Sequence, residues 1–407
     1  MHRVSRRDVF RKGGLIAAGV ASGSPVGEAA AAPKGPEVYT RIGVWPFINC
    51  TATYTINGGS MMLPEVVAAI EQASHYAVNL DELMEKVGDR LAELLQVEWG
   101  MVTAGCAAAL THATAACIAG TDPEKIQRLP DVTGMKSEVI IQKTHRNAFD
   151  HAIRNVGVKL VVLETAEEME NAISEKTAMM YFLNGAQNQG KVGLAQFIEI
   201  GKRHGVPTFN DAAADVPPKE HLNEYVKMGF DLVTFSGGKG LRGPQCAGLM
   251  IGRKDLIDAA LLNNNPHEDT LGRPCKVGKE EICGMFAALE RYWTIDHVAE
   301  WQDWEARLAS VEKVVATVPG VHMGRHVPEV ANHVPHLYFQ WDEKAFGLTQ
   351  AECGKLLEDG DPSIICLEGE SSQSLSITPF MMKPGEERIV ARRLKEIFAS
   401  ALKKAQG

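Results

Sequence analysis

The sequence lacks several features that would indicate particular classes of protein. It has 42 lysine and arginine residues against 51 aspartate and glutamate residues, and therefore a formal charge of −9 at pH 7. A chain of this charge has no general attraction for phosphate backbones or anionic lipids, so we expect no nucleic-acid partner. Its eight cysteines are scattered, with no Cys-x-x-Cys pair. This pattern argues against a zinc framework or a disulfide scaffold, and it predicts mostly buried, reduced thiols and no metal site.

The N-terminus also lacks a long hydrophobic run. Residues 13–20 are apolar, but they are too few and too rich in glycine and alanine to form a stable transmembrane helix. Before them stands the pair Arg6-Arg7, and small alanines follow at 29–32. This order resembles a twin-arginine (Tat) export signal, which carries folded proteins across a bacterial inner membrane. We therefore expect residues 1–32 to be a signal peptide, the Tat machinery to be a partner, and the protein to be periplasmic or otherwise exported.

After this segment, buried strands alternate with helices. Such alternation predicts an α/β fold whose mostly parallel sheet is covered on both faces and binds ligands at the carboxyl ends of its strands. The expected strands are 99–103, 139–142, 159–163, 179–183, 207–211, 232–236 and 248–251, and the expected helices include 82–97, 166–174, 194–204 and 220–228.

From about residue 296 the pattern changes to that of a small α+β domain. The expected elements are a helix at 301–316, strands at 337–341, 364–367 and 375–378, and a last helix at 385–404. The predicted organisation is a signal peptide (1–32), an N-terminal arm (33–75), a large domain (76–295) and a small C-terminal domain (296–407).

The segment with the most specific chemistry is the glycine-rich turn around Lys239. A predicted strand ends at Ser236, and Gly237, Gly238 and Gly240 then flank the lysine. A Schiff-base lysine needs such surroundings, because its neutral amine must reach the carbonyl of a cofactor. The hydroxyl of Ser236 can hydrogen-bond to the phosphate of the cofactor. Taken alone, the segment could equally be a glycine-rich turn with an incidental lysine.

Two other segments support the first reading. Asp211 ends a predicted strand 28 residues before Lys239, where a carboxylate can pair with a pyridine nitrogen. At 102–109 a strand passes into a helix through small residues, among them Gly105 and Cys106, and this arrangement lets backbone N–H groups meet a phosphate. The three segments have the order and rough spacing of fold-type-I enzymes that use pyridoxal 5′-phosphate (PLP).

From about residue 41 to its end, the sequence resembles the selenocysteine synthase branch of these enzymes, and within it the D-glucosaminate-6-phosphate ammonia-lyase group. The matching stretches are 47–60, 103–109, 211–214, 235–252, 272–281 and 384–387. The resemblance implies the aspartate-aminotransferase fold, with PLP as the cofactor, Lys239 as the Schiff-base lysine and Asp211 as the partner of the ring nitrogen.

The resemblance also implies roles for further residues. The phosphate would be bound by Gly105, Cys106, Ser236 and Gln245. His145 would stack on the cofactor ring, although a lone histidine is also a common structural hydrogen-bonding residue. Candidates for substrate binding are Arg242 near the cofactor, and Arg273 and Lys276, which follow a flexible-looking 263–266 segment and could come from a neighbouring subunit. Many fold-type-I enzymes hold the substrate carboxylate with a small-domain arginine. The corresponding stretch 362–368 has none, and Arg325 is a possible substitute.

These observations predict a PLP-dependent ammonia-lyase acting on a β-hydroxy amino acid, such as an amino sugar acid. The freed amine of Lys239 would remove the α-proton, and loss of the β-hydroxyl would give an enamine that hydrolyses to a 2-keto acid and ammonia. A racemase or epimerase, a selenocysteine synthase-like transferase and a catalytically inactive periplasmic binding protein are the alternatives. A homodimer is expected, since fold-type-I sites are usually completed across a two-fold interface.

Overall fold

The computed structural model describes residues 35–368 and 374–406, so the predicted signal peptide lies outside the described residues. By its internal contacts the chain separates into two units at Pro46 and Phe47. The described part of the first unit contains the short helix α2 (Glu37–Thr40), and the second unit contains the remaining elements. The boundaries expected at residues 32, 75 and 295 stay predictions.

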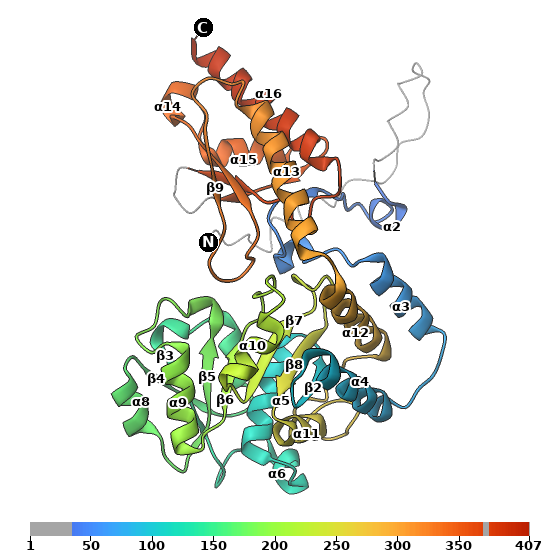
Figure 1. Ribbon diagram of the computed structural model, residues 1–407, viewed down its shortest axis with the longest axis vertical. Helices are drawn as coiled ribbons and strands as arrows, with labels where there is room; N and C mark the ends of the chain where they lie inside the picture. Colours follow the sequence, from blue (N-terminus) through green and yellow to red (C-terminus); the bar gives the residue numbers. More distant parts are fainter. Residues whose placement is uncertain (1–34, 369–373, 407) are drawn as a thin grey trace, which may run out of the picture. The chain divides into compact units, whose positions relative to one another are not determined.

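The second unit is built around a seven-stranded sheet with the order β2-β8-β7-β6-β5-β3-β4 (Figure 1). Strand β8 runs antiparallel to both of its neighbours, and the other six strands are parallel to one another. The carboxyl ends of these six strands therefore meet at one edge of the sheet, and the α/β fold expected from the sequence is confirmed. The strands are β2 (Trp99–Thr103), β3 (Glu138–Gln142), β4 (Lys159–Leu163), β5 (Thr177–Leu183), β6 (Thr208–Asp211), β7 (Leu232–Ser236) and β8 (Gly248–Gly252).

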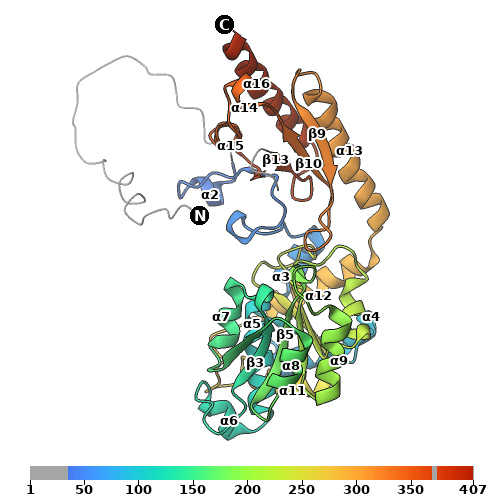
Figure 2. The same ribbon diagram turned by 90° about the vertical axis from the view of Figure 1, so that its left-hand side faces the viewer.

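Helices cover both faces of this sheet (Figures 1 and 2). On one face α8 (Ala166–Ala172), α9 (Leu194–His204) and α10 (His221–Met228) pack along β4, β6 and β7. On the other face α5 (Cys106–Ala119) crosses the middle strands, and α11 (Lys254–Leu262) packs beside it. The helices α3 (Pro64–Ser74), α4 (Leu80–Leu95), α6 (Pro123–Arg128), α7 (His151–Arg154) and α12 (Lys279–Thr294) complete this part.

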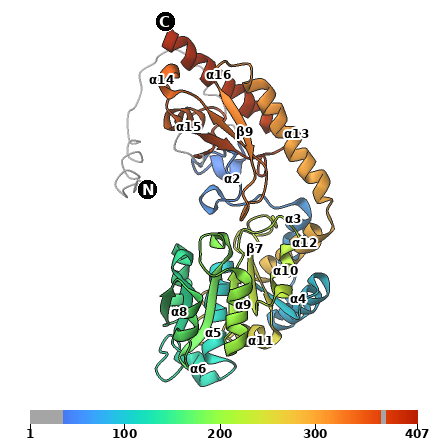
Figure 3. The same cartoon turned by 60° about the vertical axis from the view of Figure 1, so that its left-hand side comes forward.

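The C-terminal part contains a second, four-stranded sheet with the order β12-β13-β10-β9. Its strand β9 is labelled in Figure 3. Helices α13 (His297–Val315) and α16 (Glu386–Gln406) pack against each other and enclose a separate hydrophobic core. The other elements are β9 (His322–His326), β10 (His336–Gln340), α14 (Glu343–Phe346), α15 (Gln350–Glu358), β11 (Ile364–Ile365), β12 (Leu367–Glu368) and β13 (Leu375–Ile377).

Three expectations for element boundaries and burial were wrong. Helix α13 begins four residues before position 301, because the side chain of Asp296 accepts hydrogen bonds from the Val298 and Ala299 amides and caps the helix. The strand expected at 364–367 is divided: β11 pairs with β1 (Ile48–Asn49), whereas β12 pairs with β13. Residues 263–265 are not a flexible loop, because all three asparagines are buried.

The loop between β9 and β10 reaches the segment that follows β6. The Asn332 amide donates to the Ala214 carbonyl (2.9 Å), and the Thr53 hydroxyl donates to the Asn332 side-chain oxygen (2.8 Å). Within the described ranges, no helix combines the length and the apolar character needed to cross a bilayer.

Candidate active site

Lys239 lies in a tight turn at the carboxyl end of β7, and the glycines around it are required by close packing. A Cβ atom on Gly240 would lie 1.9 Å from the Val216 carbonyl oxygen, and one on Gly237 would lie 2.8 Å from the Ala247 carbonyl oxygen. No larger residue fits at either position without movement of the backbone. The turn therefore fixes the base of the half-buried Lys239 side chain.

Asp211 ends the neighbouring strand β6 and is 4% exposed. The Tyr181 hydroxyl donates to its Oδ2 (3.1 Å), and the Ala213 amide donates to its Oδ1 (3.3 Å). Burial raises the pKa of Asp211, while the Tyr181 hydrogen bond and the positive charge of Lys239 act in the opposite direction. The site therefore contains a buried acid with a fixed orientation and a nearby cation.

The residues that orient Asp211 were not predicted from the sequence. Asn147 Nδ2 donates to the Tyr181 hydroxyl (3.2 Å) and to the His145 carbonyl (2.9 Å), and these bonds complete a chain from the end of β3 to Asp211. Tyr181 is fully buried in β5 and is indistinguishable from a core residue in the sequence pattern. The only available signal was a polar hydroxyl in the interior of an apolar strand.

The turn predicted to bind phosphate stands where β2 passes into α5. Gly105 precedes the helix with a φ of 83°, a backbone conformation that favours glycine, and it offers no side chain to cap the first amides. Ala107, in the first turn of the helix, is exposed. No side chain caps the amino end of the 14-residue helix α5, so its first N–H groups and its positive dipole end are available to an anion.

The structure brings these three features together. Burial raises the pKa of the Cys106 thiol to about 12, the charge of Asp211 adds to this increase, and Lys239 opposes it. Cys106, Asp211 and Lys239 are therefore close enough for their charges to interact. Ser236, the last residue of β7, is half-buried at the same edge of the sheet.

Gln245 lies beside this group on the segment that returns to β8. Its side chain is exposed, and a Cβ atom on Gly59 would lie 1.7 Å from its Oε1. The next residue, Ser60, donates its amide hydrogen to the Gly238 carbonyl (2.9 Å). The Ser60 hydroxyl is buried and has no hydrogen-bond partner among the described residues. The 59–60 segment thus closes one side of the lysine turn.

His145 lies close to the site, but its ring is fully enclosed by protein. Its Nδ1 accepts a hydrogen bond from the Leu183 amide (3.1 Å), and its ring meets Phe182 edge-on at 4.4 Å between centroids. Burial lowers the pKa of His145 to about 4, so the ring is neutral at pH 7. Stacking of this ring on a cofactor stays a prediction, and the enclosure of both ring faces in this structure does not favour it.

Arg242 follows the lysine turn in a left-handed conformation with a φ of 55°. Its Nε donates to the Met61 carbonyl (3.1 Å). Burial lowers the pKa of Arg242, and the carboxylates of Glu300 and Glu65 oppose this effect. The guanidinium therefore lies near the carboxylates of Glu300 and Glu65, and its role toward substrate stays a prediction.

Three other candidates for substrate binding, Arg273, Lys276 and Arg325, do not lie beside Lys239 and Asp211 of the same chain. Gly272 packs against His112, six residues into α5, so Arg273 lies beside the middle of the helix and not at its amino end. Lys276 is exposed. Arg325 forms ion pairs with Glu305 (3.1 Å) and Glu312 (3.2 Å), which occupy its guanidinium.

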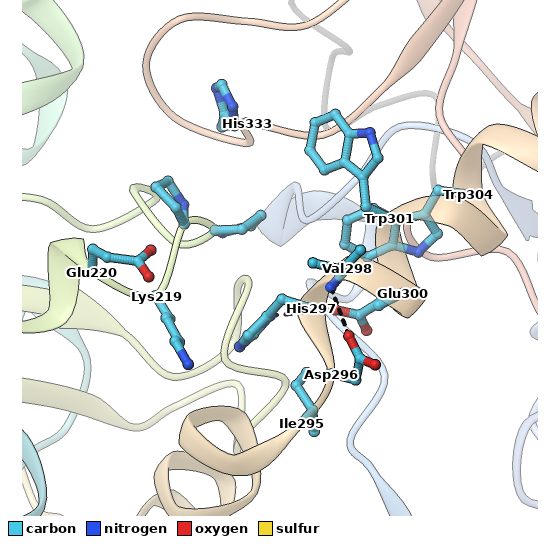
Figure 4. A pocket seen from close by; sticks show the side chains of 12 residues that line it. Lys219, Glu220, Ile295, Asp296, His297, Val298, Glu300, Trp301, Trp304 and His333 are labelled. Atoms are coloured by element: carbon cyan, nitrogen blue, oxygen red, sulfur yellow. Dashed lines mark hydrogen bonds and ion pairs between the residues drawn. The ribbon is translucent and has the colours of Figure 1, made fainter.

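A cavity of about 450 Å³ is lined in part by Pro217 and Pro218, which follow Val216, the residue on which Gly240 packs (Figure 4). Its lining also includes Glu300 and Trp301 from α13, and His333 from the loop between β9 and β10. This cavity adjoins the site but contains neither Lys239 nor Asp211. Among the described residues, no group of three histidine, cysteine or acidic side chains could hold a metal ion.

The residues at the sheet edge fit PLP. The uncapped amino end of α5 suits the phosphate, the buried Asp211 suits a protonated ring nitrogen, and Lys239 suits the aldehyde carbon. The unpartnered Ser60 hydroxyl beside the lysine turn is one further polar group for a ligand to satisfy.

Comparisons with known proteins agree with this description. A 5′-C-glycyluridine monooxygenase-decarboxylase from Streptomyces sp is 28% identical over 373 residues, covering 88% of this chain and 91% of the relative. A D-glucosaminate-6-phosphate ammonia lyase from Salmonella typhimurium is 27% identical over 374 residues, covering 89% and 98%. A solved D-glucosaminate-6-phosphate ammonia-lyase is 26% identical, with a TM-score of 0.80 and coverage of 90% of this chain and 99% of the other.

The family model described as SelA, L-seryl-tRNA selenium transferase, matches residues 48–302, a segment that includes the lysine turn, Asp211 and the amino end of α5. The chain belongs to the SelA family.

Proposed function

We propose that the protein is a PLP-dependent ammonia-lyase acting on a β-hydroxy amino acid, an amino sugar acid such as D-glucosaminate or its 6-phosphate. Water is eliminated first, and the resulting enamine then takes up water and releases ammonia to leave a 2-keto acid. The proposal rests on one observation: Lys239, Asp211 and the amino end of α5 lie together at one edge of the sheet. PLP is the cofactor of the family, and the ammonia-lyase that this chain resembles spans almost the same length.

Each of these residues then has a definite task. The first amides of α5 and the Ser236 hydroxyl would bind the phosphate, and Lys239 would hold the cofactor covalently. The released Lys239 amine accepts the α-proton of the substrate. Asp211, oriented by Tyr181, would keep a proton on the ring nitrogen of the bound cofactor. When bound, PLP supplies the electron withdrawal that makes the α-proton acidic.

A second candidate function is an oxidative decarboxylation, and the relative named 5′-C-glycyluridine monooxygenase-decarboxylase favours it. It is as similar to this chain as the ammonia lyase is, and it matches a comparable share of the chain. The two functions give different products: ammonia and a 2-keto acid from the first, and carbon dioxide from the second. Loss of carbon dioxide also does not need proton removal by Lys239.

The deciding experiment incubates the purified PLP-loaded protein with D-glucosaminate, with its 6-phosphate and with simpler β-hydroxy amino acids. Ammonia, 2-keto acid, carbon dioxide and oxygen uptake are measured together, with Lys239→Ala as the control. Equal amounts of ammonia and 2-keto acid are the expected result. Oxygen uptake with carbon dioxide release would instead establish the second candidate, and inversion of the α-carbon without ammonia would establish a racemase.

We also propose that the protein acts as a homodimer, with Arg273 and Lys276 reaching the site of the partner subunit. Large apolar side chains between residues 54 and 78 are exposed, and Ile56 (91%) and Tyr76 (71%) are the most exposed of them. Such a surface is typical of a subunit interface. Light scattering should give about twice the mass of one chain. Mixing Lys239→Ala with Arg273→Ala protein should restore some activity, because one hybrid site would keep both residues.

We further propose that the protein is exported through the Tat machinery, on the order of the Arg6-Arg7 pair, the apolar run and the alanines at 29–32. Cell fractionation tests this proposal. The mature protein should reach the periplasm, and Arg6→Lys with Arg7→Lys should keep the precursor in the cytoplasm.

A further inference from the structure

Two cysteines occupy directly opposite positions where the N-terminal strand β1 meets β11. The strands are parallel, with Asn49 opposite Ile365, and the Cys50 amide donates to the Ile365 carbonyl (2.9 Å). The pairing thus continues by one residue beyond each strand and places Cys50 opposite Cys366. In sequence these two positions are more than 300 residues apart, so only the fold brings them together.

The two side chains point to the same face of this pair of strands. Side chains alternate along a strand, so Cys50 shares the face of Ile48, and Cys366 shares the face of Ile364. Both isoleucines lie in the C-terminal hydrophobic core, to which Cys50 also belongs. The Cys366 thiol lies close enough to Cys50 to contribute to the raised pKa of the Cys50 thiol. Cys50 is fully buried, whereas Cys366 is half-buried and more open to a reagent.

The backbone spacing permits a covalent bond between the two sulfurs. Neighbouring strands lie about 4.7–4.9 Å apart, and disulfides join Cα atoms separated by about 4.4–6.8 Å. We propose that Cys50 and Cys366 are a disulfide site, closed by a disulfide oxidant such as glutathione disulfide. The eight cysteines of this structure are all thiols, so the reaction starts from the state described.

The reaction is a pair of thiol–disulfide exchanges. The thiolate of Cys366 attacks one sulfur of the oxidant and releases the first oxidant thiol. The Cys50 sulfur then attacks the Cys366 sulfur of this mixed disulfide and releases the second. Two protein thiols are oxidised, one oxidant disulfide is reduced to two thiols, and the two thiol protons pass to the leaving thiolates. Burial raises the pKa of the Cys50 thiol, so the second step should be slow at neutral pH and faster at higher pH.

The bond would fix a segment that leads directly to the lysine turn. Asn49 holds the start of this segment, because its side chain accepts from the Thr51 amide (2.8 Å) and donates to the Ala52 carbonyl (3.0 Å). The segment ends at Ser60, whose amide donates to the Gly238 carbonyl. A closed disulfide would therefore tie β11 covalently to the chain that flanks Lys239.

A third cysteine lies near Cys366 and could compete with Cys50 for the bond to it. Cys353, in α15, is fully buried and lies close enough to Cys366 for their charges to interact. It belongs to a helix and shares no strand register with Cys366, so we expect it to remain reduced. The partner chosen by Cys366 is therefore a direct test of the register argument.

The experiment uses the full-length protein, reduced and then exposed to glutathione disulfide at pH 8. Free thiols are counted after denaturation, and unreduced proteolytic peptides are analysed by mass spectrometry. The expected result is loss of two thiols, a mass lower by about 2 Da, and a Cys50–Cys366 cross-linked peptide. A midpoint of thermal unfolding several degrees above that of the reduced protein should accompany the bond.

Variants separate the possible outcomes. Cys366→Ser should lose the cross-link, and Cys353→Ser, the matched control in the same core, should keep it. Unchanged thiol numbers in the wild-type protein, or a cross-link between Cys353 and Cys366, would overturn the proposal. The wild-type peptide map decides the question even if Cys366→Ser does not fold.

Discussion

Replacing Tyr181 by phenylalanine removes one hydroxyl from the buried group around Asp211. The hydroxyl donates to Asp211 Oδ2 (3.1 Å) and accepts from Asn147 Nδ2 (3.2 Å), while the ring packs in the core of the sheet. Phenylalanine keeps the ring, so we expect the fold to be retained. Asp211 loses a neighbour that stabilises its charged form.

The expected magnitude follows from the strength of one hydrogen bond to a charged group. Such a bond contributes about 1.5–3 kcal/mol, which corresponds to a decrease in kcat/KM of about 10- to 100-fold if the bond acts fully in the transition state. Because the Tyr181 hydrogen bond lowers the pKa of Asp211, its loss raises that pKa further. The acidic limb of the pH–rate profile should therefore move to higher pH.

The assay is the pH dependence of ammonia release, with cofactor binding followed by visible absorbance. Tyr225→Phe is the matched control, since Tyr225 is also a buried tyrosine whose hydroxyl contacts a carboxylate, that of Asp215 (3.5 Å). We expect the control to keep the wild-type profile. A Tyr181→Phe enzyme with unchanged kcat/KM and an unchanged acidic limb would refute the reasoning.

Three other predictions can be checked on the same preparations. Lys239→Ala should abolish turnover and the visible absorbance of bound PLP while its circular dichroism stays that of the wild type. Gly240→Ala should lower the free energy of unfolding by about 1–3 kcal/mol in denaturant titrations, because the new Cβ would lie 1.9 Å from the Val216 carbonyl oxygen. Gly185→Ala, whose Cβ would meet nothing within 4 Å, is its control and should change little. Burial raises the pKa of Asp215 from 3.8 to about 6, so its contribution to stability is complete below pH 4 and is lost as the pH rises through about 6. The unfolding free energy of wild type relative to Asp215→Asn should fall over this range by up to about 3 kcal/mol, and a constant difference would contradict the assignment.

The sheet could be predicted closely because all of its strands except the partly exposed edge strand β4 are mostly buried. Strands β2, β4 and β7 have the predicted bounds, since continuous apolar runs that end at glycine or polar residues leave little ambiguity. The start of helix α13 was predicted less exactly, because it depends on one capping aspartate and not on the apolar periodicity of the helix. The asparagines at 263–265 looked like a loop, but tertiary packing buries them, and composition does not reveal such packing.

The residues of the candidate site could also be predicted only in part. Lys239 and Asp211 could be singled out because glycines flank the lysine and a strand ends at the acid. Tyr181 and Asn147 could not, because 34 residues separate them in the sequence and only the adjacency of β3, β5 and β6 brings them to Asp211. Arg273 was proposed from sequence, but the packing of Gly272 on His112 places it beside the middle of α5 within its own chain.

The antiparallel direction of β8 has a consequence for how the site can vary. Lys239 stands on a hairpin between adjacent strands, and not on a crossover that passes through a helix. The returning strand begins at Gly248, where a Cβ atom would lie 2.7 Å from the backbone of Gly105. A shift of β8 by one residue would therefore displace both the turn that contains Lys239 and the turn at Gly105 that precedes α5. Insertions between β7 and β8 should be poorly tolerated, so diversification of substrates would have to occur in the segments around this hairpin.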